Sequence, residues 1–196
     1  MRFLELFSAR THPLEESETF AQFYENTHQN IFRYVMASCE GNVTLAEDVT
    51  TETYLRAWKN RRSFSGTSDA AFGWVLTISR RLLIDKFRAS SSRPPENELV
   101  DDIEDQNQNT ETMLLNHELS EHLIEALQIL PENKREMILL RYVLGWRVNQ
   151  IAGYLSMPEN TISVSLRRSL KQLQKYLIMQ GVRDERPECK TDYLHS

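Results

Sequence analysis

Apolar residues recur at helical spacing along two separate stretches of the chain, and neither stretch shows the apolar–polar alternation of a β-strand. In the first stretch the pattern predicts a helix that ends before Gly41, a second helix over about residues 44–60, and a third over about residues 68–88. Thr44 and Glu47 have the spacing of a capping box, so we expect them to open the second helix.

The second stretch predicts further helices that end in a helix-turn-helix. A leucine-rich stripe runs up to Leu130, and Pro131 suits the first turn of the next helix. A short helix over residues 148–155, a turn at 156–160 and a long helix over about residues 158–177 follow. We therefore expect an all-α fold made of two small helical domains, the C-terminal one a helix-turn-helix.

An acidic segment separates the two stretches. Residues 91–118 contain one basic and eight acidic side chains, whereas the whole chain has a net charge of -5. The segment opens with serines and paired prolines, a composition that buries too little apolar surface to fold alone. We predict one domain at residues 15–88, a flexible acidic linker at 89–118 and a second domain at 119–180.

One face of the second predicted helix is polar but contains a leucine. Asp48, Glu52, Leu55 and Lys59 follow one another at spacings of 4, 3 and 4, so they share the face opposite the apolar stripe. A leucine among charges suggests a surface for a partner. The alternative is a solvated face with one stray leucine, which is ordinary in globular proteins.

The third predicted helix combines an aromatic ring with cations on one side. This side contains Trp74, Thr77, Arg81, Asp85 and Arg88, with Arg80 nearby and Arg61 and Arg62 before the preceding loop. Such a surface suits single-stranded nucleic acid, because cations bind phosphates while the ring stacks on an unpaired base. The alternative is a core tryptophan with a fringe of arginines whose stems cover apolar surface.

The outward face of the long C-terminal helix is small and polar at first and basic further on. It contains Asn160, Ser163, Arg167, Lys171 and Lys175, with Arg168 beside them. This order suits a helix that reads base edges with its first turn and holds phosphates further along. The alternative is an ordinary helical hairpin with a basic surface.

Three segments, in this order, resemble the extracytoplasmic-function (group IV) sigma factors of the sigma-70 family. The first reads AEDVTTETYLRAW at 46–58, and the second reads FGWVLTISRRLLID at 72–85. The third begins LPENKRE at residue 130 and continues through 140–142, 151–152 and 160–162. The resemblance covers about residues 18–88 and 119–177, which is most of the chain.

The resemblance implies three binding surfaces. Core RNA polymerase would be bound, through the clamp helices of its largest subunit, by Asp48, Glu52, Leu55, Arg56 and Lys59. The minus-10 promoter element, with one base flipped into the loop at 63–68, would be bound by Arg61, Arg62, Phe64, Ser65, Gly66, Trp74, Thr77, Arg80, Arg81 and Arg88. The minus-35 element would be bound by Arg147, Asn160, Thr161, Ser163, Ser165, Arg167, Arg168 and Lys171. The acidic linker would thread into the positively charged channels of the polymerase, with a simple disordered spacer as the alternative.

The helix-turn-helix departs from the family pattern at a few positions. Arg147 stands where Ser or Thr usually caps its first helix, and Ser156 and Asn160 replace the usual turn glycines. Ser163 and Ser165 replace basic residues early in the recognition helix. These changes leave the fold intact and bear on the promoter sequence that the helix reads.

The sequence predicts no enzyme, metal or cofactor. It has no P-loop, GxSxG, HExxH or dinucleotide fingerprint, and Cys39 and Cys189 belong to no metal or redox motif. It also has no long apolar stretch or signal peptide, so we expect a cytoplasmic protein without membrane insertion.

The expected partners are bacterial core RNA polymerase and promoter DNA, with an anti-sigma factor as a further candidate and no small-molecule substrate. Two alternatives are a helix-turn-helix transcriptional regulator that does not join polymerase, and a sigma-like interaction protein that forms no active holoenzyme.

Overall fold

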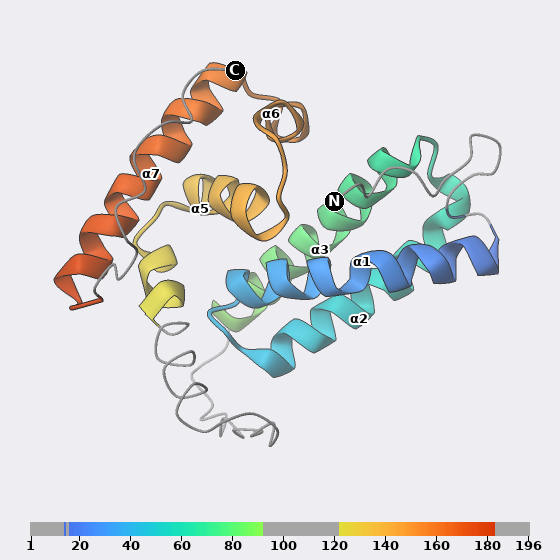
Figure 1. The fold of residues 1–196 in the computed structure, drawn as a ribbon. Coiled ribbons are helices and arrows are strands. Elements are labelled where there is room, and N and C mark those ends of the chain that lie inside the picture. The colour runs from blue at the N-terminus through green and yellow to red at the C-terminus, as the bar shows by residue number, and fades with distance from the viewer. Residues whose placement is uncertain (1–13, 15, 92–121, 183–196) are drawn as a thin grey trace, which may run out of the picture.

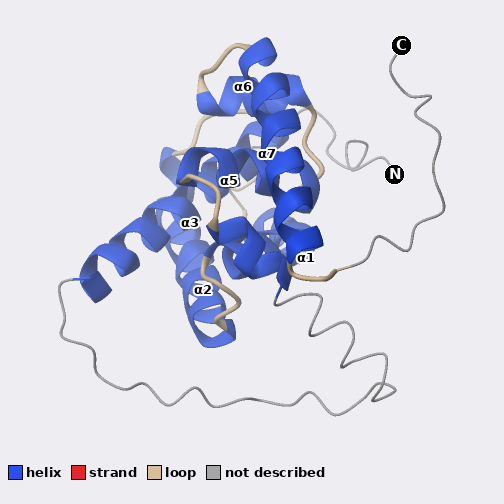
Figure 2. Cartoon of the chain, turned by 90° about the vertical axis from the view of Figure 1, so that its left-hand side faces the viewer, coloured by secondary structure: helices blue, strands red, loops and turns tan. Residues whose placement is uncertain are grey.

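The computed structural model describes residue 14 and residues 16–91 and 122–182, and the regular elements in these ranges are helical throughout (Figure 1, Figure 2). The all-α class predicted from the spacing of apolar residues is therefore confirmed. The predicted helix-turn-helix is present as the last two helices of the described chain.

Three helices form the N-terminal half: α1 (Ser17–Ser38), α2 (Val43–Asn60) and α3 (Ser68–Ser91), with the short 3-10 turn η1 (Arg61–Ser63) after α2. Each of the three helices packs against the other two. Their apolar stripes meet in an interior whose fully buried members include Ile31, Val35, Ala46, Ala57, Val75 and Leu76. Burying a valine, leucine or isoleucine side chain stabilises a fold by about 1.5–3 kcal/mol, so these stripes hold the helices together.

Helix α2 begins one residue earlier than expected. The Asn42 side chain accepts a hydrogen bond from the Leu45 backbone N–H at 2.8 Å, so Asn42 caps the helix. The predicted capping box of Thr44 and Glu47 is wrong, because both residues already have helical backbone. The reason is that Gly41, with a φ of 81°, reverses the chain and leaves Asn42 extended where a cap must stand.

Cys39 follows the last turn of α1 and is buried. Burial raises the pKa of its thiol to about 11. The thiol is therefore protonated at neutral pH and fills apolar space rather than acting as a nucleophile.

Helix α3 continues to Ser91, three residues beyond the predicted end of the first domain at residue 88. Nothing in residues 89–91 stops a helix, whereas Pro94 and Pro95 lie just beyond. The rest of the predicted linker, residues 92–118, lies outside the described residues, as do 1–13, 15, 119–121 and 183–196. The domain boundaries at 15, 118 and 180 stay predictions.

The C-terminal half contains helical residues 122–128, α5 (Glu132–Ile138), the π-helical turn η2 (Leu139–Val143), α6 (Val148–Leu155) and α7 (Glu159–Met179). The long helix α7 packs on α5 and α6. Apolar residues from all of these helices are buried between them, including Met137, Leu140, Ile151, Ile162, Leu166 and Leu173.

Arg135 joins the first two helical segments of this half. Its guanidinium donates hydrogen bonds to the backbone carbonyls of Leu127, Gln128 and Leu130 at 3.0, 3.3 and 3.2 Å. These carbonyls lie at the end of helical residues 122–128 and just beyond it, where a helix leaves carbonyls without intrahelical partners, although the Leu127 carbonyl also accepts the Leu130 backbone N–H at 3.2 Å. Pro131 directly precedes α5 as its cap residue, one position before the first turn where we expected it.

The two halves lie against each other (Figure 1). Their buried apolar residues form one continuous cluster, in which α1 packs on η2. A Cβ added to Gly41 would lie 3.0 Å from Ile124 Cδ1, so the turn between α1 and α2 also contacts residues 122–128. As a result, the C-terminal half covers one side of α3.

Candidate functional site

The outward face of α2 presents the five predicted polymerase-binding residues to solvent or near it. Leu55 is 48% exposed and lies between charged side chains. Arg56 Nε donates to Glu52 Oε1 at 2.7 Å one helical turn away. This hydrogen bond holds the pKa of Glu52 below its usual value. Asp48 and Lys59 are exposed at the two ends of the face.

A shallow hollow of about 270 Å³ borders Leu55, and sequence reasoning did not find it. It is lined by Phe20, Tyr24, Thr51, Tyr54, Leu55 and Trp58. The first two side chains come from α1, so the hollow exists only because α1 packs beside α2. Tyr24, itself 42% exposed, stacks on His28 and meets the Tyr54 ring edge-on. The sequence shows that the hollow has aromatic residues available to line it, but only the packing of α1 on α2 brings them next to Leu55.

Of the two arginines after α2, Arg61 packs against α2 and Arg62 does not. The Arg61 guanidinium lies over the Trp58 ring, with Cζ 3.5 Å from the ring centre, and Nη1 donates to the Trp58 carbonyl at 2.8 Å. Arg61 thus braces the loop, as a cation on an aromatic face often does. Arg62, Ser65 and Gly66 are exposed.

Phe64 is buried beneath this loop instead of presenting its ring to a ligand. Its exposed fraction is 9%, and its ring packs on Trp74 with the centroids 5.2 Å apart. A Cβ at Gly66 would approach Phe64 Cζ to 2.9 Å, so a glycine is required there for the loop to close over the ring. Trp74 itself is half-buried.

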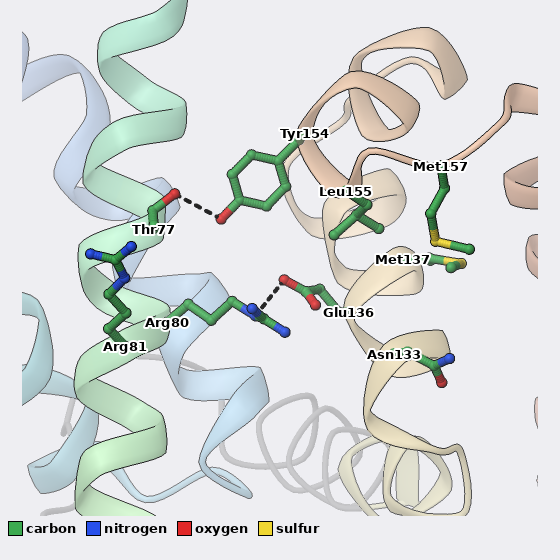
Figure 3. Close-up of a pocket in the computed structure, with 9 residues that line it drawn as sticks. All are labelled: Thr77, Arg80, Arg81, Asn133, Glu136, Met137, Tyr154, Leu155 and Met157. Carbon is green, nitrogen blue, oxygen red and sulfur yellow. Dashed lines mark hydrogen bonds and ion pairs between the residues drawn. The ribbon is translucent and has the colours of Figure 1, made fainter.

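The C-terminal half covers the side of α3 where several predicted minus-10 residues lie (Figure 3). Thr77 Oγ1 lies 3.3 Å from the Tyr154 hydroxyl of α6, within hydrogen-bond distance. Five residues earlier in α3, Phe72 meets the Trp146 ring edge-on at 6.1 Å between centroids. Arg81 and Arg88 are exposed on the same helix.

Arg80 forms an ion pair across the same boundary. Its Nε lies 2.8 Å from Glu136 Oε1 in α5, and a second guanidinium nitrogen lies 4.0 Å from Glu132. The Glu136 side chain is only 7% exposed, whereas that of Arg80 is 41% exposed. Oε1 has no donor aligned well enough to complete a hydrogen bond, so the contact is an ion pair of imperfect geometry.

Burial controls the protonation of the groups around this ion pair. Burial raises the pKa of Glu136 more than the Arg80 charge lowers it. Burial likewise raises the pKa of Tyr154, and that of Tyr34 in α1, which also faces Glu136. Beside these groups a cleft of about 380 Å³ opens between α3 and the C-terminal half, with Arg81 and Asn133 at its wall (Figure 3).

The outward face of α7 matches the sequence prediction at all but one position. Its exposed residues are Asn160, Thr161, Ser163, Arg167, Arg168 and Lys171, and Lys175 extends the basic part. Ser165 is half-buried instead, because it lies beside the apolar stripe of Ile162 and Leu166.

The turn before α7 shows how the unusual residues fit the helix-turn-helix. Ser156 has left-handed angles, with φ 54° and ψ 44°, whereas Asn160 is already in the first turn of α7. Arg147 precedes α6, and its backbone N–H donates to the Gln150 side chain at 2.8 Å. The Gln150 backbone N–H, which a Ser or Thr cap would usually accept, donates instead to Asn149 Oδ1 at 2.9 Å.

Comparison with known proteins finds two family matches in this chain. The family described as "Sigma-70 region 2" matches residues 23–93, and "Sigma-70, region 4" matches residues 120–173. The chain is 26% identical over 184 residues to the ECF RNA polymerase sigma factor SigX of Bacillus subtilis, and the matched region covers 89% of this chain and 94% of SigX. It is 30% identical over 178 residues to ECF RNA polymerase sigma factor SigL of Mycobacterium tuberculosis, and the matched region covers 85% of this chain and 93% of SigL.

Two solved structures share the fold. One is the sigma factor RpoE in complex with the anti-sigma factor NepR from Bartonella quintana, with a TM-score of 0.59 and 20% identity over 82% of this chain and 98% of RpoE. The other is CnrH in complex with the cytosolic domain of CnrY, with a TM-score of 0.61 and 17% identity over 86% of this chain and 93% of CnrH.

Among the described residues, no helix has the length and apolar character needed to cross a membrane. Three findings indicate the same family: the match to SigL over nearly its whole length, the two sigma-70 regions in their order along the chain, and the helix-turn-helix in the structure. The chain therefore belongs to the ECF RNA polymerase sigma factors of the sigma-70 family.

Proposed function

We propose that this ECF sigma factor binds core RNA polymerase through α2 and directs it to promoters by contacting the minus-10 element with its N-terminal half and the minus-35 element with α7. It contributes binding and no chemistry of its own. The exposed face of α7, polar in its first turn and basic beyond it, is the observation that carries this proposal.

Helix α7 follows a tight turn at Ser156, as the second helix of a helix-turn-helix does. Asn160, Thr161 and Ser163 have short polar side chains that suit hydrogen bonds to base edges in the major groove. The cationic side chains Arg167, Arg168 and Lys171 suit the phosphates on either side of the groove.

We assign the minus-10 contact to the loop after α2 and the exposed cations of α3. Arg62, Ser65 and Gly66 are accessible on the loop, and Arg81 and Arg88 are accessible on the helix. Phe64 and Arg61 support the loop from within the fold, through Trp74 and Trp58 respectively. Trp74 offers a partly exposed ring for base stacking.

The proposed polymerase contact combines Leu55 with the hollow beside it. An apolar side chain next to an aromatic-lined hollow and flanked by charges has the composition of a protein–protein contact. We place the protein in the cytoplasm, where RNA polymerase acts. Because RpoE and CnrH were solved with NepR and CnrY, we also propose that an anti-sigma factor binds this chain.

The proposed function is tested by transcription in vitro with purified bacterial core RNA polymerase on a library of genomic fragments. We expect the full chain to co-purify with core polymerase and to direct transcripts from a defined set of promoters. A helix-turn-helix regulator would not bind core polymerase stoichiometrically. A sigma-like interaction protein would bind it but produce no promoter-specific transcripts.

Replacing Leu55 tests the docking surface directly. We expect Leu55→Asp to reduce affinity for core polymerase at least tenfold, because it puts a charge against an apolar contact. Glu47→Ala, at another exposed position of α2, is the matched control and should bind normally. Unchanged affinity of Leu55→Asp in a fluorescence-anisotropy titration would remove this face from the proposal.

A further inference from the structure

The first residue of α7 is acidic, although the exposed face of this helix is basic further along. Glu159 is exposed and directly follows Pro158, the cap residue of the helix. Within the part of the chain that the structure describes, its carboxylate has no ion pair and no side-chain hydrogen bond. Glu159 lies next to the proposed minus-35 surface but is not among the residues assigned to it.

Glu159 shares one side of α7 with two residues of the proposed minus-35 surface. Ser163 and Arg167 are exposed and follow at intervals of four residues, and side chains four apart on a helix are neighbours. Arg167, the first cation of α7, lies about 12 Å from Glu159 along the helix axis. This row of side chains therefore changes from acidic to basic, with a neutral hydroxyl between the two charges.

The start of α7 lies where a DNA duplex can reach it. Helix α7 is on the outside of the C-terminal half, with α5 between it and α3 (Figure 1). In a helix-turn-helix, the N-terminal residues of the second helix contact base edges in the major groove. With α7 in that groove, the side chain of Glu159 faces bases, whereas Arg167 lies further along and nearer to the phosphates.

A carboxylate in the major groove needs a hydrogen-bond donor. The DNA phosphates repel it, and burying it there without a partner is costly. Because an ionised carboxylate only accepts hydrogen bonds, it cannot pair with the acceptors O6 and N7 of guanine or O4 of thymine. The donors in this groove are the amino groups at N4 of cytosine and N6 of adenine, and adenine places the acceptor N7 beside its donor. Cytosine is therefore the base that matches Glu159.

We propose that Glu159 selects a cytosine in the minus-35 element by accepting a hydrogen bond from the N4 amino group. Residues 159–163 include no arginine or lysine, so no cation of this turn competes by binding the guanine of the same base pair. The inference rests on the proposed function, because it takes α7 to be the helix that enters the groove.

Two other roles of Glu159 predict different effects on DNA binding. An acidic side chain in the first turn of a helix interacts favourably with the helix dipole, and losing this interaction would weaken binding to every sequence alike. A carboxylate that only repels the phosphates would act in the opposite sense, since its removal would strengthen binding to every sequence alike. Recognition of cytosine instead changes the preference at one base pair.

Two substitutions and one control distinguish these roles. Glu159→Ala removes the acceptor. Glu159→Gln keeps an acceptor oxygen and adds an amide donor that matches N7 of adenine, so it should admit adenine where the unchanged protein requires cytosine. Glu125→Gln is the control, because it removes a negative charge from the same half of the protein at a side chain that is 61% exposed and lies outside α7. Thermal melting of each full-length protein measures any loss of helix stability.

The experiment selects bound duplexes from a promoter library that is randomised across the minus-35 region and carries the minus-10 element found in the transcription assay. The protein used is the full chain assembled with core RNA polymerase. We expect the unchanged chain and Glu125→Gln to select cytosine at one position that Glu159→Ala leaves unselected and Glu159→Gln opens to adenine. Titration of two duplexes that differ only there should show a preference for cytosine of about five- to 150-fold in the unchanged chain and almost none in Glu159→Ala.

The same selection can overturn the role of Glu159. A minus-35 element with no selected cytosine would do so, as would a Glu159→Ala protein whose affinity changes equally for all sequences or whose base preference is unchanged. In each of these cases a selected minus-35 element leaves the proposed function intact. If the unchanged chain does not assemble with core polymerase and selects no sequence, the proposed function itself fails.

Discussion

Ser156 adopts a left-handed backbone at the end of α6, at a position that the family usually gives to glycine. A side chain in this conformation costs roughly 1–2 kcal/mol relative to the right-handed one, whereas glycine is almost indifferent. We expect Ser156→Gly to raise the free energy of unfolding by about 0.5–1 kcal/mol in urea denaturation.

Gly145, with a φ of 70°, supplies the opposite control in the loop before α6. Gly145→Ala should lower the free energy of unfolding by about 1 kcal/mol, since alanine must adopt the left-handed conformation there. A Ser156→Gly protein that is no more stable than the unchanged chain would show that the turn stores no backbone strain.

Glu136 gives the stability of the protein a specific pH dependence. Burial raises its pKa despite the nearby Arg80, so the folded chain binds this proton more tightly than the unfolded chain does. Its stabilising contribution is fully present below the ordinary glutamate value of 4.5 and is lost as the pH rises through the raised value in the folded state. Tyr34, Tyr154 and Glu132 also face this carboxyl group.

We therefore expect Glu136→Gln, which does not titrate, to become more stable relative to the unchanged protein as the pH rises from about 4.5 toward neutrality. Urea unfolding curves at several pH values measure this difference. Glu125→Gln, at a carboxyl group that is 61% exposed, serves as the control. A stability difference that stays constant with pH would contradict the assignment of a raised pKa to Glu136.

At the scale of single elements, the basic part of α7 should act through phosphates. Each lost phosphate contact lowers the slope of log affinity against log salt by about 0.9 on duplex DNA. We expect Arg167→Ala and Lys171→Ala each to weaken holoenzyme binding to a minus-35 duplex and to reduce this slope by about one unit. Gln174→Ala, at an exposed neutral position of the same helix, is the control and should leave the slope unchanged. If Arg167→Ala and Lys171→Ala also leave the slope unchanged, neither residue contacts a phosphate.

Helix bounds were predictable where they follow from the nearby sequence, and they were misjudged where they depend on backbone conformation. The bounds of α6 were predicted correctly, and those of α7 to within two residues, because their apolar positions repeat every three to four residues and Gly145 and Pro158 mark their limits. The start of α2 was misjudged, because both Asn42 and Thr44 are good caps and the choice between them depends on the backbone at Gly41.

At the scale of the whole molecule, the two halves should fold separately but stabilise each other. Each half has its own buried apolar interior, and one continuous apolar cluster joins them. We expect fragments 1–90 and 112–180 each to show helical circular dichroism and to unfold at lower temperature than the intact chain. Cooperative melting of the intact chain alone, with both fragments unfolded, would contradict a two-domain organisation.

The positions of the candidate surfaces were predictable only where exposure follows from helical periodicity. Leu55 on α2 and Arg167 on α7 lie opposite apolar stripes, and both are exposed as expected. The burial of Phe64 beneath its loop and the stacking of Arg61 on Trp58 were not predictable, since both depend on how the loop closes.

The amino-acid sequence alone was sufficient for the helical class, the order of the helices and the faces of α2 and α7, because these follow from interactions between residues three or four apart. It could not show that Thr77 and Arg80 face Tyr154 and Glu136, which are more than fifty residues away along the chain. Periodicity distinguishes an apolar face from a polar one, but a half-buried polar residue acquires its partner only when separate helices pack together.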